Sequence, residues 1–187
     1  MSSPLLETLS AIEDPVKRRA FFVALLSQRI VEQGAPMPIV VGGEALEIYT
    51  QGNYTTGDID LKASYDEMAT ALIEMGFRKR GRAFYNEQLD IYVDWLGASL
   101  DEGDEAERRT VMVELDEGHC VRLLSIEDLI MDRLNAAKWW KDSDSRMWAG
   151  LLVKIKEETG GALDMDYLRR RAARDEVEDE LEALLSL

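Results

Sequence analysis

The sequence contains few of the residues on which several classes of site depend. One cysteine, Cys120, and one histidine, His119, occur in 187 residues, so neither an internal disulfide nor a Cys/His zinc cluster can form. The sequence shows no combination of serine, histidine and aspartate that would indicate a hydrolase. No stretch approaches the ~18 uninterrupted apolar residues of a membrane helix, and the acidic first segment lacks the basic start of a secretion signal. We therefore expect a cytoplasmic protein that does not associate with membranes.

Positive charge is also scarce. There are 37 acidic residues against 22 basic ones, which gives a formal net charge of −15. Such a surface repels nucleic-acid phosphates at long range, and it raises the value of cations as components of a site. The hydrophobic content of 46% is enough for a core, and the length fits one domain or one domain with a helical appendage.

The pattern of apolar residues and turn residues divides the chain in two. Residues 1–124 predict a mixed α/β core, and residues 125–187 predict a helical segment packed on it. In the core we expect an early helix over 16–32, strands at 38–41, 57–62 and 89–96, and an acidic loop at 101–107. A hairpin over 110–115 and 119–124 would turn at Asp116-Glu117-Gly118.

The segment over residues 37–61 carries the most specific pattern. The apolar run Ile39-Val40-Val41 ends at Gly42-Gly43, a short helix is predicted from about Glu44, and Thr56-Gly57-Asp58-Ile59-Asp60-Leu61 follows. Asp58 and Asp60 are two apart, so on a strand both carboxylates leave the same face. Hard divalent cations suit such a pair, and the first amides of the helix offer an anion site beside it. A tight turn followed by an exposed edge strand is the structural alternative.

This pattern resembles the minimal nucleotidyltransferases of the DNA polymerase beta-like superfamily. The resemblance implies an α+β fold with a nucleotidyltransferase-like mixed sheet flanked by helices. It also implies that Asp58 and Asp60 hold two Mg²⁺ or Mn²⁺ ions, and that Gly42, Gly43 and the amides near Glu44 hold the triphosphate of an NTP. Thr56, just before the aspartates, is assigned to the same nucleotide site.

The family has a third carboxylate on a later strand, and two residues compete for it. Asp90 and Asp94 are four apart in the segment 89–96, so both would lie on one face. Asp94 is favoured because it sits between Val93 and Trp95, whereas an aspartate at the start of a strand is ordinary. By the resemblance, Asp94 would be a metal ligand and would orient the attacking hydroxyl.

One position departs from the family pattern. Many active members place serine or threonine after the second glycine, where the hydroxyl donates to phosphate, and this chain has Glu44 there. A carboxylate beside a triphosphate is unfavourable unless it turns away or reaches a metal. A serine at this position would restore the usual donor.

The segment 124–144 resembles a helix of toxin-type nucleotidyltransferases from abortive-infection systems. Arg133 stands where those proteins carry a lysine, and Lys138, Asp142 and Asp144 fill later positions. The resemblance implies that Arg133 and Lys138 contact the nucleotide; a solvated helix face is the alternative. The basic run Arg78-Lys79-Arg80 with Arg82 has two interpretations as well, a strip that contacts the acceptor or the phosphates, or alternating exposed strand residues.

Three functions stay open at this point. The first is a Mg²⁺-dependent transfer of a nucleoside monophosphate from NTP to an unknown hydroxyl acceptor, which is a small molecule, an RNA or a protein. The second is a catalytically degenerate protein of this fold that binds a nucleotide or a partner. The third is one half of a toxin–antitoxin pair, with an antitoxin as its protein partner.

Overall fold

The computed structural model describes residues 4–115 and 118–186, without the side chains of residues 4–6. It divides into two compact units, residues 1–124 and residues 125–187. In the first unit the described elements are, in order, α1 (Pro4–Ser10), α2 (Pro15–Glu32), β1 (Ile39–Val40), α3 (Gly42–Tyr49), β2 (Ile59–Lys62), α4 (Tyr65–Glu74), β3 (Arg78–Arg80), β4 (Ala83–Asn86), β5 (Ile91–Trp95), α5 (Asp104–Arg109), β6 (Val111–Glu114) and β7 (Cys120–Leu123).

The strands of the first unit form one mixed sheet in the order β3-β4-β5-β2-β1-β7-β6. The pairs β2/β5 and β1/β7 are parallel, and the other neighbours are antiparallel. The three strands predicted from the sequence to carry the site, β1, β2 and β5, are consecutive in this order. Together with the helices, this confirms the α+β fold class.

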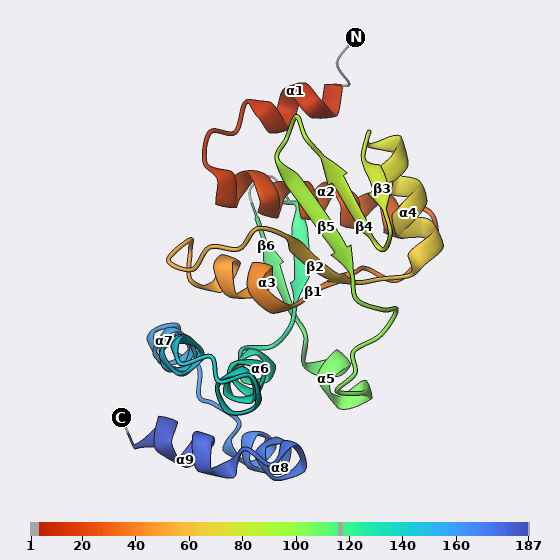
Figure 1. The fold of residues 1–187 in the computed structure, drawn as a ribbon. Helices are drawn as coiled ribbons and strands as arrows, with labels where there is room; N and C mark the ends of the chain where they lie inside the picture. Colours follow the sequence, from red (N-terminus) through yellow and green to blue (C-terminus); the bar gives the residue numbers. More distant parts are fainter. Residues whose placement is uncertain (1–3, 116–117, 187) are drawn as a thin grey trace. The chain divides into compact units, whose positions relative to one another are not determined.

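Helices α2 and α4 cover one face of the sheet, as Figure 1 shows. Asp14 caps α2, because its Oδ1 accepts the amide of Val16 at 2.9 Å, and Pro15 fits the first turn. The helix buries Phe22, which stacks on Phe77 with ring centroids 4.9 Å apart. This apolar layer covers the core face of the sheet. The polar residues of the candidate site, described below, lie on the other face.

One predicted detail of this unit changes in the structure, and another is confirmed in its strands. The expected acidic loop at 101–107 is wrong in part, since residues Asp104–Arg109 form helix α5. Acidic residues in its first turn and Arg108 and Arg109 in its last turn both favour a helix through the backbone dipole, and Ala106 is buried. The expected hairpin is present as the antiparallel pair β6/β7, whereas residues 116–117 of its turn lie outside the described part of the chain.

The second unit is helical, with α6 (Ile126–Trp139), α7 (Asp144–Glu158), α8 (Met165–Asp175) and α9 (Glu178–Leu185). Ser125 caps α6 by accepting the amide of Asp128 at 3.0 Å. Helices α8 and α9 are separated at Glu176, which has a φ of 57°.

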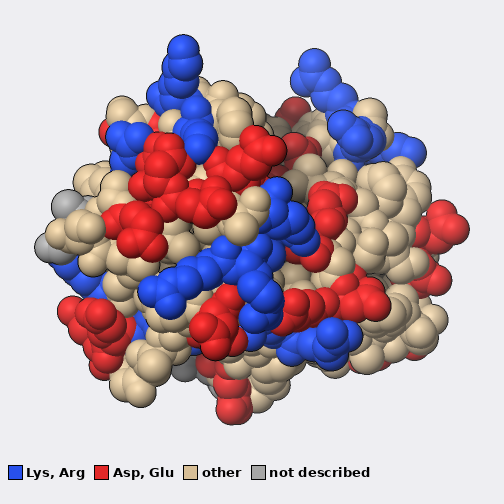
Figure 2. All heavy atoms as spheres, turned by 90° about the horizontal axis from the view of Figure 1, so that it is seen from below, with Lys and Arg blue, Asp and Glu red and all other residues tan. Residues whose placement is uncertain are grey.

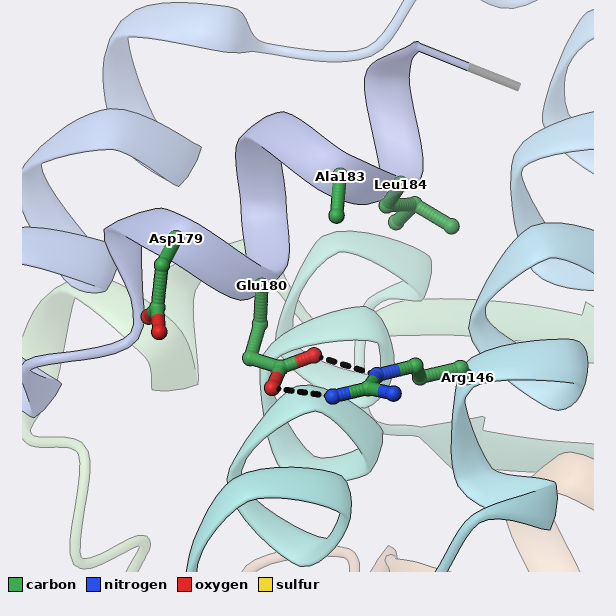
Figure 3. A pocket seen from close by; sticks show the side chains of 5 residues that line it. All are labelled: Arg146, Asp179, Glu180, Ala183 and Leu184. Atoms are coloured by element: carbon green, nitrogen blue, oxygen red, sulfur yellow. Dashed lines mark hydrogen bonds and ion pairs between the residues drawn. The ribbon is translucent and has the colours of Figure 1, made fainter.

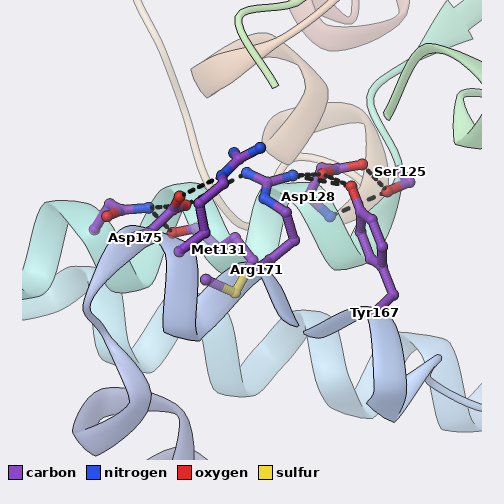
Figure 4. A network of polar contacts seen from close by, with 8 residues as sticks. Ser125, Asp128, Met131, Tyr167, Arg171 and Asp175 are labelled. Carbon is purple, nitrogen blue, oxygen red and sulfur yellow. Dashed lines mark hydrogen bonds and ion pairs between the residues drawn. The ribbon is translucent and has the colours of Figure 1, made fainter. Parts of the chain in front are cut away.

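A buried polar network joins α6 to α8 (Figure 4). The carboxylate of Asp128 accepts hydrogen bonds from Ser125 Oγ at 2.6 Å, from Tyr167 at 2.6 Å and from Arg171. Burial, reinforced by the bond to Asp128, raises the pKa of Tyr167 to about 12, so its hydroxyl stays a donor. Every partner of this buried carboxylate is a donor, so the network stabilises the packing of the two helices.

A small hollow between α7 and α9 is closed by an ion pair (Figure 3). Arg146 donates to both carboxylate oxygens of Glu180 at 2.6 Å, and Asp179, Ala183 and Leu184 line the same hollow. Because the arginine is already engaged in a two-point contact, we assign this pair to helix packing.

On the face seen in Figure 2, a band of basic side chains runs between groups of acidic ones, so the two signs alternate there. Among the described residues, no helix is both long and apolar enough to cross a membrane.

Candidate active site

The candidate site forms where β2 and β5 run side by side. Their parallel register places Asp60 directly opposite Asp94, and Asp58 precedes Asp60 by two residues. One carboxylate oxygen from each of Asp58, Asp60 and Asp94 lies within 4.8 Å of the other two, and all three residues are partly buried. The structure therefore brings together the three aspartates that the sequence singled out.

Asp90, the competing third carboxylate, is not in this group. It lies in the turn before β5, is exposed, and has a φ of 53°. Aspartate is one of the few residues that accept this left-handed conformation readily, which gives Asp90 a local role in the turn.

The two glycines are required by the close approach of backbone and carboxylates. Gly42 has a φ of 57°, and a Cβ built on it would lie 2.5 Å from Asp60 Oδ2. A Cβ on Gly43 would lie 2.7 Å from Thr56 Oγ1. A side chain at either position would thus displace a group of the site, so glycine is the residue that lets the start of α3 sit against the aspartates.

Thr56 orients the first aspartate. Its hydroxyl donates to Asp58 Oδ1 at 3.2 Å, which restrains that carboxylate beside Asp60. Helix α3 itself begins at Gly42 with no side-chain cap, so no side chain competes for the amides of its first turn. These amides and the helix dipole favour an anion there.

Glu44 turns away from this anion position. Its side chain is fully buried, and its Oε2 accepts a hydrogen bond from Arg19 Nε of α2 at 3.0 Å. Arg19 also contacts the carboxylate of Glu47, which is buried too. Burial raises the pKa of Glu44 to about 7; Arg19 opposes this shift, while Asp60 and Asp58 add to it.

The geometry agrees with that direction. One guanidinium faces two carboxylates, so full ionisation would leave one buried negative charge uncompensated. In addition, Glu44 Oε1 is buried without a hydrogen-bond partner in the described part of the chain. Arg19 is the residue that sequence reasoning missed, because nothing in the pattern around it indicates a partner 25 positions away.

The remaining predicted residues lie in the helical unit and have local partners there. Arg133 pairs with Asp132 at 2.5 Å. Lys138 donates to Asp179 at 2.6 Å and to the carbonyl of Glu176 at 2.6 Å. Asp142 accepts the hydroxyl of Ser145 at 2.6 Å at the start of α7. Contact of Arg133 or Lys138 with a nucleotide stays a prediction.

Comparison with known proteins supports the fold. No family model matches the chain, and no curated protein matches it either. The solution structure of the antibiotic-resistance factor ANT(2″)-Ia, an aminoglycoside nucleotidyltransferase, matches with a TM-score of 0.53 and 20% identity, over 88% of this chain and 97% of that one. A crystal structure of ANT(2″)-Ia in complex with adenylyl-2″-tobramycin has a TM-score of 0.49 and 21% identity, over 83% and 97% of the two chains. The chain therefore has a nucleotidyltransferase-like fold, as the first of these comparisons shows.

Proposed function

We propose that the protein transfers a nucleoside monophosphate from an NTP to a hydroxyl acceptor, with Mg²⁺ or Mn²⁺ as the cofactor. The observation that carries the proposal is the convergence of Asp58, Asp60 and Asp94 within 4.8 Å, against a helix start that only glycine permits. The fold, which is shared with a known nucleotidyltransferase, is consistent with it.

The three carboxylates fit the proposed cations. Mg²⁺ prefers oxygen ligands and usually binds through one or two carboxylates together with substrate phosphates. Asp58 and Asp60 would hold both ions, and Asp94 would hold one ion and orient the attacking hydroxyl. When bound, such ions neutralise the charge of the triphosphate and stabilise the attacking and leaving oxygens of an in-line displacement.

The side chains and amides of the chain then have definable tasks. Thr56 restrains Asp58, and the amides at the start of α3 donate to the phosphates of the NTP. The acceptor oxygen forms a bond to the α-phosphorus as the bond to pyrophosphate breaks, and the hydroxyl proton is released to solvent. Arg133 and Lys138 are the proposed additional phosphate ligands.

The buried position of Glu44 supports an active enzyme over a degenerate one. The objection to catalysis was a carboxylate beside the triphosphate, and this carboxylate instead faces Arg19 inside the core. The nucleotide would therefore meet the backbone amide of Glu44 and not its side chain. A serine at this position would remove one of the two carboxylates that face Arg19 in the core and would leave Glu47 paired with that arginine.

The test is a labelling experiment with a matched pair of variants. The protein is incubated with Mg²⁺, a cell extract and NTPs labelled at the α-phosphate. Wild type and Asp90→Asn should label one acceptor class, while Asp94→Asn should lose the label. The reason is that Asp94 belongs to the carboxylate group with Asp58 and Asp60, and Asp90 does not. Labelling that is equal in the two variants would exclude the proposed site. Nucleotide binding without labelling in wild type would identify a degenerate member of the fold.

A further inference from the structure

A row of paired residues runs from the carboxylate site to the edge of the sheet. Asp60 of β2 lies opposite Asp94 of β5, Asp94 opposite Ala83 of β4, and Ala83 opposite Arg80 of β3. Side chains of directly paired residues point to the same face of a sheet. Arg80 therefore stands on the face of the candidate site, two strand spacings or roughly 10 Å from the strand of Asp94.

A second row on the same face carries aromatic rings. Tyr92, two residues before Asp94, lies opposite Tyr85, and Tyr85 lies opposite Arg78. The two tyrosine rings are 6.3 Å apart at their centroids and inclined by 18°. Tyr92 is 42% exposed, whereas Phe84 and Val93, which point to the other face, are completely buried.

The arginines of these rows are open to a ligand. Arg78 and Arg80 are exposed, and neither takes part in an ion pair within the described ranges 4–115 and 118–186. Arg78 and Tyr85 also line a hollow with Gly76, Asn86, Glu87 and Gln88, in which Glu87 is the acidic member. Lys79, between the two arginines, differs, since its Nζ lies 5.2 Å from the ring centroid of Tyr65 of α4.

Protection of a sheet edge does not account for this arrangement. Charged residues on an edge strand prevent pairing with other chains, and any charge on β3 would serve that purpose. Such protection requires neither the exposed Tyr92 and half-buried Tyr85 on the two inner strands nor continuity with the row of Asp94 and Asp60. Planar rings and arginines beside the candidate site suit a ligand that carries both a flat aromatic group and a phosphate.

We propose that Tyr92, Tyr85, Arg78 and Arg80, here called the tyrosine–arginine face, bind the acceptor, and that the acceptor is a phosphorylated nucleoside. Its base would stack on the tyrosines, its phosphate would pair with the arginines, and its hydroxyl would reach the carboxylate site. Stacking of a base on an aromatic ring contributes about 1–3 kcal/mol, and arginine binds phosphate through two parallel hydrogen bonds. This inference rests on the proposed function and names its acceptor class.

Two sources offer this chemistry, a free nucleotide and the terminal nucleotide of a single-stranded RNA. The net charge of −15 opposes a long polyanion, so the face would engage one or a few nucleotides. Both sources present the same base and phosphate to the same residues, and the binding experiment separates them.

The experiment measures acceptor binding by calorimetry, without NTP or metal, so that it does not depend on turnover. The probes are AMP and a short single-stranded oligoribonucleotide with a free 3′-hydroxyl. The variants are Arg78→Gln combined with Arg80→Gln, Tyr92→Leu and Tyr92→Phe. The matched control is Arg82→Gln, which removes an exposed arginine of the same hairpin that lies outside both rows.

We expect wild type to bind at least one probe, and the probe that binds more tightly identifies the source. The double arginine variant and Tyr92→Leu should each weaken binding at least about tenfold, whereas Tyr92→Phe and Arg82→Gln should stay within about twofold. No binding of either probe, or equal weakening by Arg82→Gln, would overturn the proposal. Mn²⁺ binding, measured separately on the same variants, should be unchanged. A wild type that does not bind Mn²⁺ would refute the proposed function, whereas the tyrosine–arginine face is tested by the nucleotide-binding data.

Discussion

The buried carboxyl of Glu44 makes the stability of the metal-free protein depend on pH. Its pKa of about 7 in the folded chain lies above the ordinary value of 4.5, mainly because of burial. Below pH 4.5 the group is protonated in both states and does not oppose folding. As pH rises from 4.5 to 7, the unfolded chain loses this proton while the folded chain retains it, so stability falls. Above about pH 7 the loss is complete.

The size of this loss follows from the shift. The difference between 4.5 and about 7 corresponds to about 3 kcal/mol of unfolding free energy. The perturbation that isolates it is Glu44→Gln, which imitates the protonated carboxyl and does not titrate. Urea unfolding in the presence of a chelator, at several pH values between 4.5 and 7.5, gives the free energies of both proteins.

Other groups titrate in the same range, so the informative quantity is the difference between the two proteins. We expect wild type to lose about 3 kcal/mol relative to Glu44→Gln between pH 4.5 and 7.5. A constant difference across this range would show that Glu44 is ionised throughout and that Arg19 compensates its charge fully. A wild type that gains stability relative to the variant as pH rises would reverse the sign and refute the reasoning.

Two further predictions concern single contacts. Gly42→Ala should destabilise the fold by roughly 1–2 kcal/mol because Gly42 has a left-handed φ. The same variant should weaken Mn²⁺ binding, because the new Cβ meets Asp60 Oδ2. The control is Gly57→Ala, where nothing lies within 4 Å of the added Cβ; thermal melting and metal titration should show neither effect for it. In the helical unit, Asp128→Asn should lower the unfolding free energy by about 3–5 kcal/mol, since it removes the fully buried counter-charge of Arg171 and leaves that arginine with Asp175 at 3.5 Å. Tyr167→Phe removes one hydrogen bond to the same carboxylate and should lower it by about 2 kcal/mol or less; equal losses in these two variants would contradict the assignment of charge to Asp128.

Local patterns predicted the parts of the site that lie close together in the chain. The spacing of Asp58 and Asp60 on a strand places both on one face, and the glycine pair marks a strand end where a helix begins. Asp94 is identifiable because a carboxylate inside an apolar strand needs a reason. The parallel register of β2 and β5 places Asp94 opposite Asp60, so the two carboxylates meet where a divalent cation would bind. Register depends on pairing between distant segments, so the sequence alone indicated the residue but not the contact.

The parts that escaped prediction depend on contacts across the fold or on competing local signals. Arg19 reaches Glu44 only because α2 packs beside α3, and no residue near either one signals the pair. The segment of α5 is rich in acids, which predicts a loop, although its charges follow the helix dipole and Ala106 is buried. The tyrosine–arginine face likewise emerges from the pairing of three strands, whereas the sequence showed only a basic run beside aromatic residues.

The central claim is that three aspartates form a divalent metal site, and Mn²⁺ binding tests it most directly. The measurement is a titration of the metal-free protein with Mn²⁺, followed by electron paramagnetic resonance of the unbound ion. Wild type and Asp90→Asn should bind with the same affinity, because Asp90 lies outside the group and asparagine accepts its φ of 53°. Asp60→Asn should weaken binding at least about tenfold, since it removes the central carboxylate. Equal affinity in Asp60→Asn and Asp90→Asn, or no binding by wild type at millimolar Mn²⁺, would contradict the account.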